Sequence, residues 1–394
     1  MQRVLLGITG GIAAYKAAEL ARLFIRAGYP VQVVMTAAAT KFITPLTFET
    51  ITGNKVALDL FGGPIEGRVR HISLADGAEI MVVAPASANT LAKMAHGIAD
   101  NLLTTLFLAV RCPVVLVPSM NEAMYAHPAV QKNIQMLRDM GCHIMEPEAG
   151  ELACGVVGKG RLPDPSDIFC FVRAVLSPKD FRGVRALVTA GPTREHFDPV
   201  RFISNPSSGR MGYAMARALS ERGAAVTLVS GPCSLNCPAG VERIEVCTAE
   251  EMYHAVLARF AECHLVIKAA AVSDFRPATV APQKVKKDAG AETVRLENTP
   301  DILKELGRRK QNQVLVGFAA ETEQAEAHGR EKLEKKNLDL IVVNDLTAAG
   351  AGFASLTNRV SLINRSGAVE HLPLMEKETL AHHILDRIVA LLPR

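Results

Sequence analysis

Three segments in the first half of the chain carry side chains that could do chemistry. Pro118-Ser119-Met120-Asn121 directly follows an apolar, strand-like run, so the Asn121 amide is expected at a sheet edge, where it could hold a carboxylate or serve as a helix N-cap. Glycines stand on both sides of Cys154, which is typical of a flap carrying a thiol and untypical of a buried, inert cysteine. His71 stands alone in its segment, and a lone histidine is more often structural than catalytic.

Two loops of small residues in the same half follow apolar runs. Gly10 and Gly11 precede a helix-like segment, so backbone N–H groups and the helix N-terminus can meet a phosphate. The full G-x-G-x-x-G spacing is missing, and a tight strand–helix turn explains the glycines equally well. The second loop, 84–90, offers hydroxyls and an amide with little bulk. Two such loops at one sheet edge favour a phosphorylated cofactor.

These segments together resemble the phosphopantothenoylcysteine decarboxylases, a flavin-containing family, in the histidine, the P-x-M-N-x-x-M run and the flap cysteine. The resemblance spans the first domain and implies FMN, which would oxidise the substrate thiol, allow CO2 to leave and return the electrons. It assigns acid–base work to His71, the substrate carboxylate to Asn121 and proton donation to Cys154. Tyr125 stands where many relatives carry Trp and keeps an aromatic wall. The implied FMN contacts are Gly10, Gly11, Ile12, Thr36, Ala86, Ser87, Asn89 and Thr90.

A long connection in the second half gathers polar and cationic residues. About twenty residues separate a strand-like run from the next helix, and loops of that length are usually functional or disordered. Ser207, Gly209 and Arg210 fall at the start of the helix, where an anion is favoured. A serine N-cap would explain Ser207, but it would not explain the nearby concentration of Arg201, Asn205 and Arg210.

A further loop of this half combines small residues with a carboxylate. The segment from Ala270 to Asp274 would let a planar base approach the backbone, and its carboxylate could face a ribose or a metal. Lysines cluster beyond it, among them Lys284, Lys332 and Lys336. Lysine-rich faces are usually only solvated, but two clusters beside nucleotide-type loops in a near-neutral chain favour a polyphosphate ligand.

These segments resemble the phosphopantothenate-cysteine ligases, and the order of the two halves is similar to that of the bifunctional bacterial coenzyme A biosynthesis proteins. The resemblance implies that CTP and Mg²⁺ activate 4'-phosphopantothenate as an acyl-cytidylate, which cysteine then attacks. It places Asn205 at this intermediate and identifies no magnesium ligand. The implied CTP contacts are Ala270, Asp274, Lys284, Pro300, Asp301, Ile302, Leu303, Phe318, Lys332 and Lys336. The implied substrate contacts are Arg201, Ser207, Gly209 and Arg210.

The elements that must position these residues follow one pattern twice. Short continuous apolar runs alternate with helix-compatible stretches, as expected of parallel sheets covered on both faces. The pattern stops near Ser177 and restarts at Ala186. We therefore expect an α/β protein of two tandem doubly wound, Rossmann-like three-layer domains, at 1–183 and 184–394. The first should be flavodoxin-like, and the second should bind a nucleotide and project a lysine-rich loop or ribbon between 279 and 297.

Bulk properties narrow the function classes further. A chain of 394 residues is long for one core, and its 49% hydrophobic and 21% charged residues are typical of folded α/β proteins. A net charge of +4 gives no field that would recruit nucleic acid. No apolar run approaches the roughly 20 residues of a membrane span, and eight scattered cysteines favour reduced thiols, so we expect a cytoplasmic enzyme with small-molecule substrates. Relatives of both domains form symmetric assemblies, which implies a homo-oligomer.

Two alternatives come from other classes of protein. A nicotinamide oxidoreductase with two Rossmann-type units would require a dinucleotide fingerprint, which neither glycine turn supplies. A nucleotide-binding scaffold without turnover would leave the three glycines around Cys154 unexplained.

Overall fold

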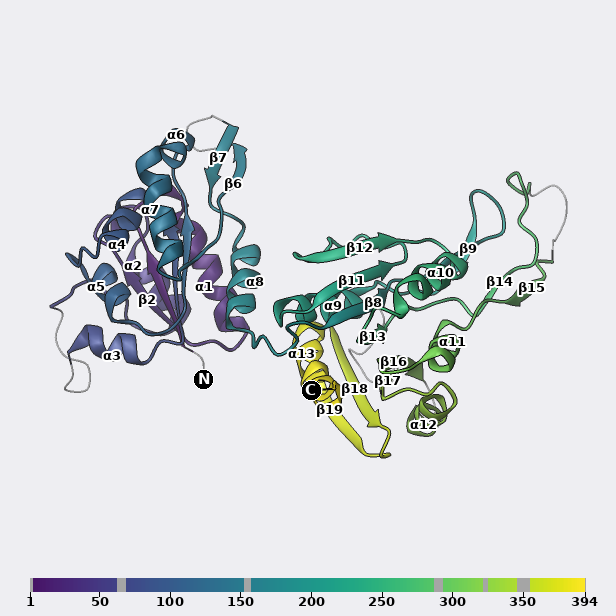
Figure 1. The fold of residues 1–394 in the computed structure, drawn as a ribbon. Helices are drawn as coiled ribbons and strands as arrows, with labels where there is room; N and C mark the ends of the chain where they lie inside the picture. Colours follow the sequence, from purple (N-terminus) through teal and green to yellow (C-terminus); the bar gives the residue numbers. More distant parts are fainter. Residues whose placement is uncertain are drawn as a thin grey trace. The chain divides into compact units, whose positions relative to one another are not determined.

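The computed structural model describes residues 3–61, 69–151, 157–286, 293–321, 325–345 and 355–393. Its contacts divide the chain into two compact units, Met1–Ser177 and Pro178–Arg394 (Figure 1). The second unit begins before the predicted boundary at 184 because Phe181 is fully buried in its core. Asp180 also pairs with Arg222 of that unit at 2.5 Å.

The first unit is built on a parallel five-stranded sheet of order β2-β1-β3-β4-β5. This is the flavodoxin-like strand order, in which the chain reverses direction across the sheet between β1 and β3. Every residue of the central strands is buried, which explains their continuous apolar sequence. The five strands are β1 Val4–Ile8, β2 Val31–Met35, β3 Ile80–Ala86, β4 Val114–Pro118 and β5 His143–Ile144.

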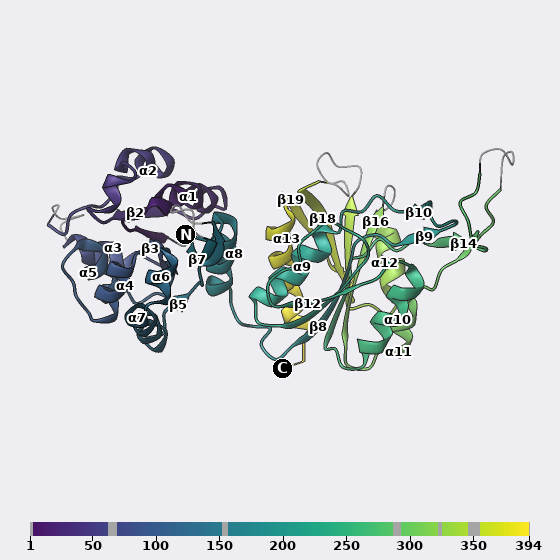
Figure 2. The same cartoon turned by 90° about the horizontal axis from the view of Figure 1, so that it is seen from above.

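Helices cover both faces of this sheet (Figure 2). One core joins α1, α2 and α8 to the sheet, and the other joins α3, α4, α5 and α7. An antiparallel hairpin of β6 Glu148–Glu151 and β7 Val157–Arg161 follows β5. The helices are η1 Ile12–Tyr15, α1 Lys16–Arg26, η2 Ala39–Lys41, α2 Pro45–Thr52, α3 Arg70–Asp76, α4 Ala88–Ala95, α5 Leu102–Ala109, α6 Glu122–Ala126, α7 Pro128–Asp139 and α8 Pro165–Leu176.

The second unit contains an eight-stranded sheet of order β12-β11-β8-β13-β16-β17-β18-β19. It is parallel from β12 to β17, and the last two strands form an antiparallel hairpin on it. The chain again reverses direction between its first strand, β8, and β13. The strands are β8 Arg185–Ala190, β11 Ala225–Ser230, β12 Val241–Glu245, β13 Leu265–Lys268, β16 Val314–Glu321, β17 Leu340–Asp345, β18 Thr357–Asn364 and β19 Val369–Glu376.

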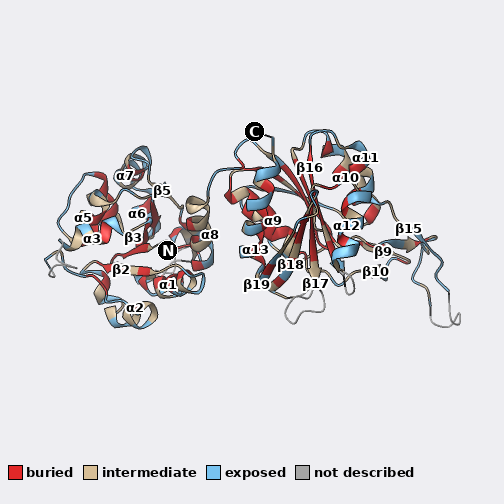
Figure 3. Ribbon diagram, turned by 90° about the horizontal axis from the view of Figure 1, so that it is seen from below, coloured by how far each residue is buried: buried red, intermediate tan, exposed pale blue. Residues whose placement is uncertain are grey.

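Helices α9 and α13 cover one face of this sheet, and α10, α11 and α12 cover the other. Buried residues concentrate on the strands and on the helix faces that meet them (Figure 3). The pairs β9/β10 and β14/β15 extend beyond the sheet as an arm (Figure 1). The elements are β9 Arg194–His196, β10 Phe202–Ser204, β14 Phe275–Pro277, β15 Leu296–Asn298, α9 Arg210–Glu221, α10 Ala249–Phe260, α11 Ile302–Arg309, α12 Ala325–Lys335, α13 Lys377–Ile388 and η4 Val389–Leu391.

The predicted fold class is confirmed: the chain folds as two Rossmann-like α/β units. Strand β12 was not predicted, because three of the five residues in its sequence VERIE are charged and no continuous apolar run marks it. It lies at the edge of the sheet, and these three charged residues are exposed.

Candidate active sites

A cavity of about 690 Å3 lies in the first unit, at the carboxyl ends of β1, β3 and β4. Open α/β sheets bind ligands at this edge and at this switch point. The cavity combines backbone from glycine turns with apolar side chains, two cations and one amide. Its lining is Gly10, Gly11, Ile12, Ala13, Tyr15, Lys16, Ser87, Ala88, Ser119, Met120, Asn121, Met124, Gly160, Arg161 and Leu162.

The buried hydroxyl of Thr9 joins the two small-residue loops of this cavity. Its Oγ1 donates to the Pro85 carbonyl at 2.8 Å and accepts the Ser87 amide at 2.9 Å. The glycine turn after β1 and the loop after β3 are therefore held together by one side chain.

The glycine turn has room for a ligand on one side only. A Cβ at position 10 would lie 2.5 Å from Ala38 Cβ, whereas a Cβ at Gly11 would meet nothing within 4 Å. Gly10 is thus required by packing, and Gly11 leaves backbone open to the cavity. Beside it, Ile12 and Tyr15 are more than half exposed although they are large apolar residues. An open phosphate-sized turn next to apolar walls fits the phosphate and flat ring of FMN.

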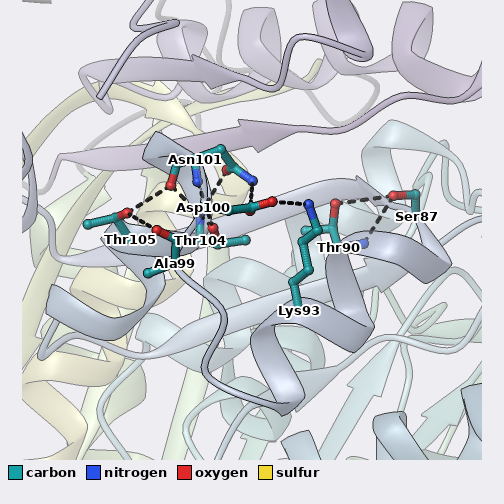
Figure 4. A network of polar contacts seen from close by, with 8 residues as sticks. All are labelled: Ser87, Thr90, Lys93, Ala99, Asp100, Asn101, Thr104 and Thr105. Atoms are coloured by element: carbon teal, nitrogen blue, oxygen red, sulfur yellow. Dashed lines mark hydrogen bonds and ion pairs between the residues drawn. The ribbon is translucent and has the colours of Figure 1, made fainter. Parts of the chain in front are cut away.

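A polar network fixes the helix that carries Ser87 (Figure 4). Ser87 Oγ lies 3.1 Å from Thr90 Oγ1 and accepts the Thr90 amide at the start of α4. At the end of the same helix, Lys93 Nζ donates to Asp100 at 2.5 Å, and Asn101 Nδ2 donates to Asp100 at 2.8 Å. Asn101 and Thr104 then form a capping box on α5. The two ends of α4 are therefore anchored, which sets the position of Ser87 at the cavity.

The base of the β6/β7 hairpin packs against the segment that carries Asn121. Met120 N donates to the Gly160 carbonyl at 3.0 Å. A Cβ at Gly160 would lie 2.2 Å from the Met120 carbonyl, and one at Gly158 would lie 2.2 Å from Glu122 Oε2. Gly160 is therefore needed for this close approach to backbone, whereas the end of the Glu122 side chain could move to make room at position 158.

Glu146 ties this hairpin to α6 and α7. Its Oε2 accepts the Tyr125 hydroxyl at 2.5 Å and Lys159 Nζ at 2.7 Å, and its Oε1 accepts Arg138. Lys159 also lies 5.4 Å from the centroid of the Tyr125 ring. Burial, followed by the Glu146 carboxylate, raises the pKa of Tyr125 to about 12. The phenol is therefore a permanent hydrogen-bond donor, and burial of Glu146 is offset by its bonds to Lys159 and Tyr125, so its pKa is lowered.

Five predicted residues line this cavity: Gly10, Gly11, Ile12, Ser87 and Asn121. The Asn121 side chain also caps α6, because its Oδ1 accepts the Ala123 amide at 2.9 Å. Asn121 therefore lines the cavity and also caps α6 through its Oδ1.

Four predicted FMN contacts are not among the lining residues. Ala86 and Thr90 are buried, and Asn89 is exposed on α4. Thr36 closes a turn after β2, where its Oγ1 accepts the Ala39 amide at 3.3 Å.

His71 does not line the cavity and lies on α3. Its Nδ1 is buried and has no hydrogen-bond partner among the described residues. Cys154 falls outside the described residues.

A second cavity, of about 310 Å3, lies at the switch point of the second unit. The start of α9 forms one side of it, and the loop after β13 with the ends of β16 and β17 forms the other. Its lining is Asn205, Ser207, Ser208, Gly209, Arg210, Met211, Gly212, Lys268, Ala269, Ala270, Ala271, Val272, Asp274, Phe318, Ala319, Ala320, Lys332, Asn344, Asn358 and Lys377.

Asn205 connects the two sides of this cavity. Its Nδ2 donates to the carbonyls of Ala271 and Val272, each at 3.2 Å, so the long connection before α9 is held on the loop after β13. Thr193 assists, because its Oγ1 accepts the Ser273 amide at 3.0 Å. The Asn205 Oδ1 is left for a ligand in the cavity.

Lys268 brings a half-buried cation to the same cavity. It ends β13, and its Nζ lies 3.5 Å from the Ala270 carbonyl. Burial, and next the positive charge of Lys336, lower the pKa of Lys268 to about 8, while Asp301 and Asp274 act in the opposite sense. Asp301 itself pairs with Lys336 at 3.0 Å. A cavity with this surplus of cations suits a polyphosphate.

The structure brings eight predicted residues to this cavity: Asn205, Ser207, Gly209, Arg210, Ala270, Asp274, Phe318 and Lys332. Arg201 is not among them, because its guanidinium pairs with the buried Asp198 at 2.5 Å. Lys284 is exposed, and Lys336 with Asp301 and Pro300 stands outside the lining. Ile302 and Leu303 are buried in the core.

Sequence reasoning missed several lining residues. Lys16 and Arg161 bring cations to the first cavity, and Lys268, Asn344 and Lys377 bring polar groups to the second. Lys268 was detectable, because it ends an apolar strand just before the small-residue loop. Lys377 was not, because nothing in its local sequence shows that α13 begins at this edge.

Two family models together match almost the whole chain. The flavoprotein family model matches residues 1–177, and the model of the DNA/pantothenate metabolism flavoprotein C-terminal domain matches residues 181–392. The coenzyme A biosynthesis bifunctional protein of Bacillus subtilis is 47% identical over 394 residues, covering 99% of this chain and 97% of the relative. That of Escherichia coli K12 is 44% identical over 393 residues, covering 98% and 97%.

Solved structures match each unit separately. The C-terminal domain of a coenzyme A biosynthesis bifunctional protein shares 42% identity, with a TM-score of 0.47, over 54% of this chain and 97% of that one. An FMN-dependent cysteine decarboxylase shares 33% identity, with a TM-score of 0.39, over 45% of this chain and 98% of that one. On the two family models and the full-length relatives, the chain belongs to the bifunctional coenzyme A biosynthesis proteins.

Proposed function

We propose that the two cavities carry the two consecutive reactions of this family. The chain is a bifunctional ligase and carboxy-lyase of coenzyme A biosynthesis. The ligase half condenses 4'-phosphopantothenate with cysteine at the expense of CTP, through an acyl-cytidylate. The flavin-dependent half then decarboxylates 4'-phosphopantothenoylcysteine to 4'-phosphopantetheine. The observation that carries this assignment is the contrast between a cavity with large apolar residues beside its glycine turn and a cavity lined by four cations, Arg210, Lys268, Lys332 and Lys377.

In the first cavity, FMN would be held by the open glycine turn and by Ser87, with Ile12 and Tyr15 beside its ring. Bound FMN supplies a two-electron acceptor that makes loss of CO2 possible. The Asn121 Oδ1 accepts the Ala123 amide, and Nδ2, the donor of this side chain, would face the substrate carboxylate. Apolar surface beside that carboxylate would favour its conversion to neutral CO2. Proton donation by Cys154 stays a prediction, as its segment is outside the described residues.

Acid–base work by His71 requires a second copy of the chain in this proposal. His71 lies on α3 and does not line the cavity of its own unit, yet its buried Nδ1 has no hydrogen-bond partner in the described part of the chain. A homo-oligomer would bring it to the cavity of a neighbour. Co-expression of His71→Ala and Asn121→Asp chains should restore a fraction of the decarboxylase activity that either variant alone lacks. Failure of every such mixture, in oligomers shown to contain both chains, would contradict the shared site.

In the second cavity, Asn205 Oδ1 and the amides at the start of α9 would orient the acyl-cytidylate, and Lys268 with Lys332 would stabilise charge on the phosphates. Asp274 supplies one carboxylate for Mg²⁺. Among the described residues no three His, Cys, Asp or Glu side chains gather as a metal site, so we infer that Mg²⁺ arrives with CTP.

Two assays test the assignment directly. Purified protein should show a flavin spectrum, and a colourless preparation that FMN cannot reconstitute would refute the first half. Pyrophosphate release should require CTP, Mg²⁺ and 4'-phosphopantothenate together; equal release with ATP would refute the cytidine assignment.

We also propose that the enzyme is located in the cytoplasm. In the described part of the chain no helix is both long and apolar enough to cross a bilayer. The seven described cysteines are all free, which is consistent with the reducing environment of a cytoplasm.

A further inference from the structure

Another cavity of the second unit lies beside the one of about 310 Å3, which we call the nucleotide cavity. It measures about 780 Å3 and is formed at the carboxyl ends of β11 and β12, next to the start of α9. We call it the Arg194 cavity. Its lining is Arg194, Ser207, Ser208, Arg210, Tyr213, Ser230, Gly231, Pro232, Cys233, Ser234, Leu235, Arg243, Glu245, Val246, Cys247 and Glu251.

The Arg194 cavity and the nucleotide cavity share one wall. Ser207, Ser208 and Arg210 line both of them. Gly209, the N-cap of α9, has a φ of 76° and provides no side-chain cap, so the first turn of a twelve-residue helix presents its amides at this wall. A ligand bound across the wall would reach both cavities.

The charges of the Arg194 cavity favour an anion. The Arg194 guanidinium is held 4.7 Å from the centroid of the Phe202 ring and forms no ion pair with a described residue. Arg243 pairs with Glu245 and also donates to the Leu235 carbonyl at 3.2 Å. The other acid, Glu251, is occupied as the cap of α10, where it accepts the Cys247 amide at 2.6 Å. Three arginines and two glutamates line the cavity, so it carries one positive charge in excess.

Neutral donors surround these arginines. The Tyr213 hydroxyl and Ser230 Oγ are 3.0 Å apart, and Ser230 Oγ is 3.4 Å from Cys233 Sγ. A Cβ at Gly209 would lie 3.4 Å from that sulfur, so this polar group borders the shared wall. Arginine forks with hydroxyls and amides are the usual donors to a phosphate group.

We propose that the Arg194 cavity binds a phosphate group of a reactant of the ligase half. The inference rests on the proposed ligase function and extends it to residues outside the nucleotide cavity. In the activation step, a carboxylate oxygen of the acyl substrate bonds to the α-phosphorus of CTP as its bond to the bridging oxygen breaks. The electron pair of that bond leaves on pyrophosphate. The bound phosphate therefore belongs either to the terminal phosphates of CTP or to the 4'-phosphate of the acyl substrate.

Binding measurements on the full-length enzyme test the proposal. Wild type, Arg194→Ala, Arg243→Ala and Arg243→Lys would each be titrated with pyrophosphate, 4'-phosphopantothenate, pantothenate and CMP. The half-buried Arg259, which pairs with Glu242 at 3.6 Å and lines neither cavity, provides the matched control Arg259→Ala. Circular dichroism and thermal melting establish that each variant is folded.

Each alanine variant should weaken one of the two phosphate ligands by about tenfold or more, leave CMP binding unchanged, and recover in part with Arg243→Lys. Weaker binding of pyrophosphate assigns the cavity to the nucleotide. Weaker binding of 4'-phosphopantothenate, with unchanged binding of pantothenate, assigns it to the acyl substrate. Unchanged affinity for both phosphates, or an equal loss for CMP, would overturn the proposal. Pyrophosphate release by wild type tests the ligase function separately.

Discussion

The two cavities occupy equivalent places in similar sheets but differ in what lines them. Each lies at the carboxyl ends of parallel strands beside the point where strand order reverses. In the first unit the walls beside the glycine turn are apolar, with Ile12 and Tyr15 exposed to the cavity side of η1. In the second unit the equivalent edge carries Lys268 and Lys332. The same backbone architecture thus offers a surface for a flat ring in one unit and for phosphates in the other.

The difference teaches that strand order sets where a ligand can bind and that a few edge residues set which ligand it is. Substitutions at those residues should therefore affect one reaction and spare the other. The expected effects range from the loss of one reaction to a small change in stability.

Asn121→Asp should slow decarboxylation by a factor of about 100 or more, because it removes an amide donor and places a charge beside the substrate carboxylate. The aspartate can still accept the Ala123 amide, so α6 keeps its cap. CO2 release from 4'-phosphopantothenoylcysteine measures the loss. CTP-dependent pyrophosphate release provides the internal control and should remain at the wild-type rate. A parallel fall in both reactions would contradict the independence of the two sites.

Lys268→Ala should reduce kcat/KM for CTP by about tenfold, because one cation of the nucleotide cavity is lost. The pKa of about 8 adds a test by pH. Lys268 is protonated at pH 7 and loses its charge as pH rises through 8, so the wild-type kcat/KM should fall on that limb. The groups that share its field are Asp274, Asp301, Lys332 and Lys336.

Lys268→Arg keeps its charge over this pH range. Its kcat/KM should therefore not fall above pH 8, and most of the activity should be retained. Lys304 lies on the exposed side of α11, and Lys304→Ala serves as the control. This variant should show the same fall of kcat/KM near pH 8 as the wild type. If Lys268→Arg shows the same fall near pH 8, another group is responsible.

Tyr125→Phe should have the smallest effect. It removes the 2.5 Å bond to Glu146, which joins α6 to the hairpin base, and should lower the free energy of unfolding by about 1 to 2 kcal/mol. Urea titration measures this loss, and the KM of decarboxylation should rise a few-fold with little change in ligation. Tyr29→Phe is the matched control, since Tyr29 packs against Phe24 and no bond of its hydroxyl to a described residue is seen. Equal losses for both variants would show that the Glu146 bond contributes nothing specific.

The sequence predicted the sheets well because continuous apolar strands alternate with amphipathic helices over the whole chain. It also predicted the loops that end β1, β3, β4 and β13, because small residues follow apolar runs there. It could not show that Arg201 is taken up by Asp198, or that His71 lies away from the cavity of its own unit, because both depend on long-range packing. The Arg194 cavity was missed for the same reason: its arginines come from β9, α9 and β12, which are distant in sequence.

The most direct test of two independent sites that act in sequence is to measure both products on one preparation. Enzyme given 4'-phosphopantothenate, cysteine, CTP and Mg²⁺ should release pyrophosphate first and then CO2 in equal final amount. Asn121→Asp should release pyrophosphate at the normal rate and CO2 more slowly by a factor of about 100 or more, with 4'-phosphopantothenoylcysteine accumulating. CO2 release from that variant at the wild-type rate, or pyrophosphate release that falls together with decarboxylation, would contradict the assignment of one reaction to each unit.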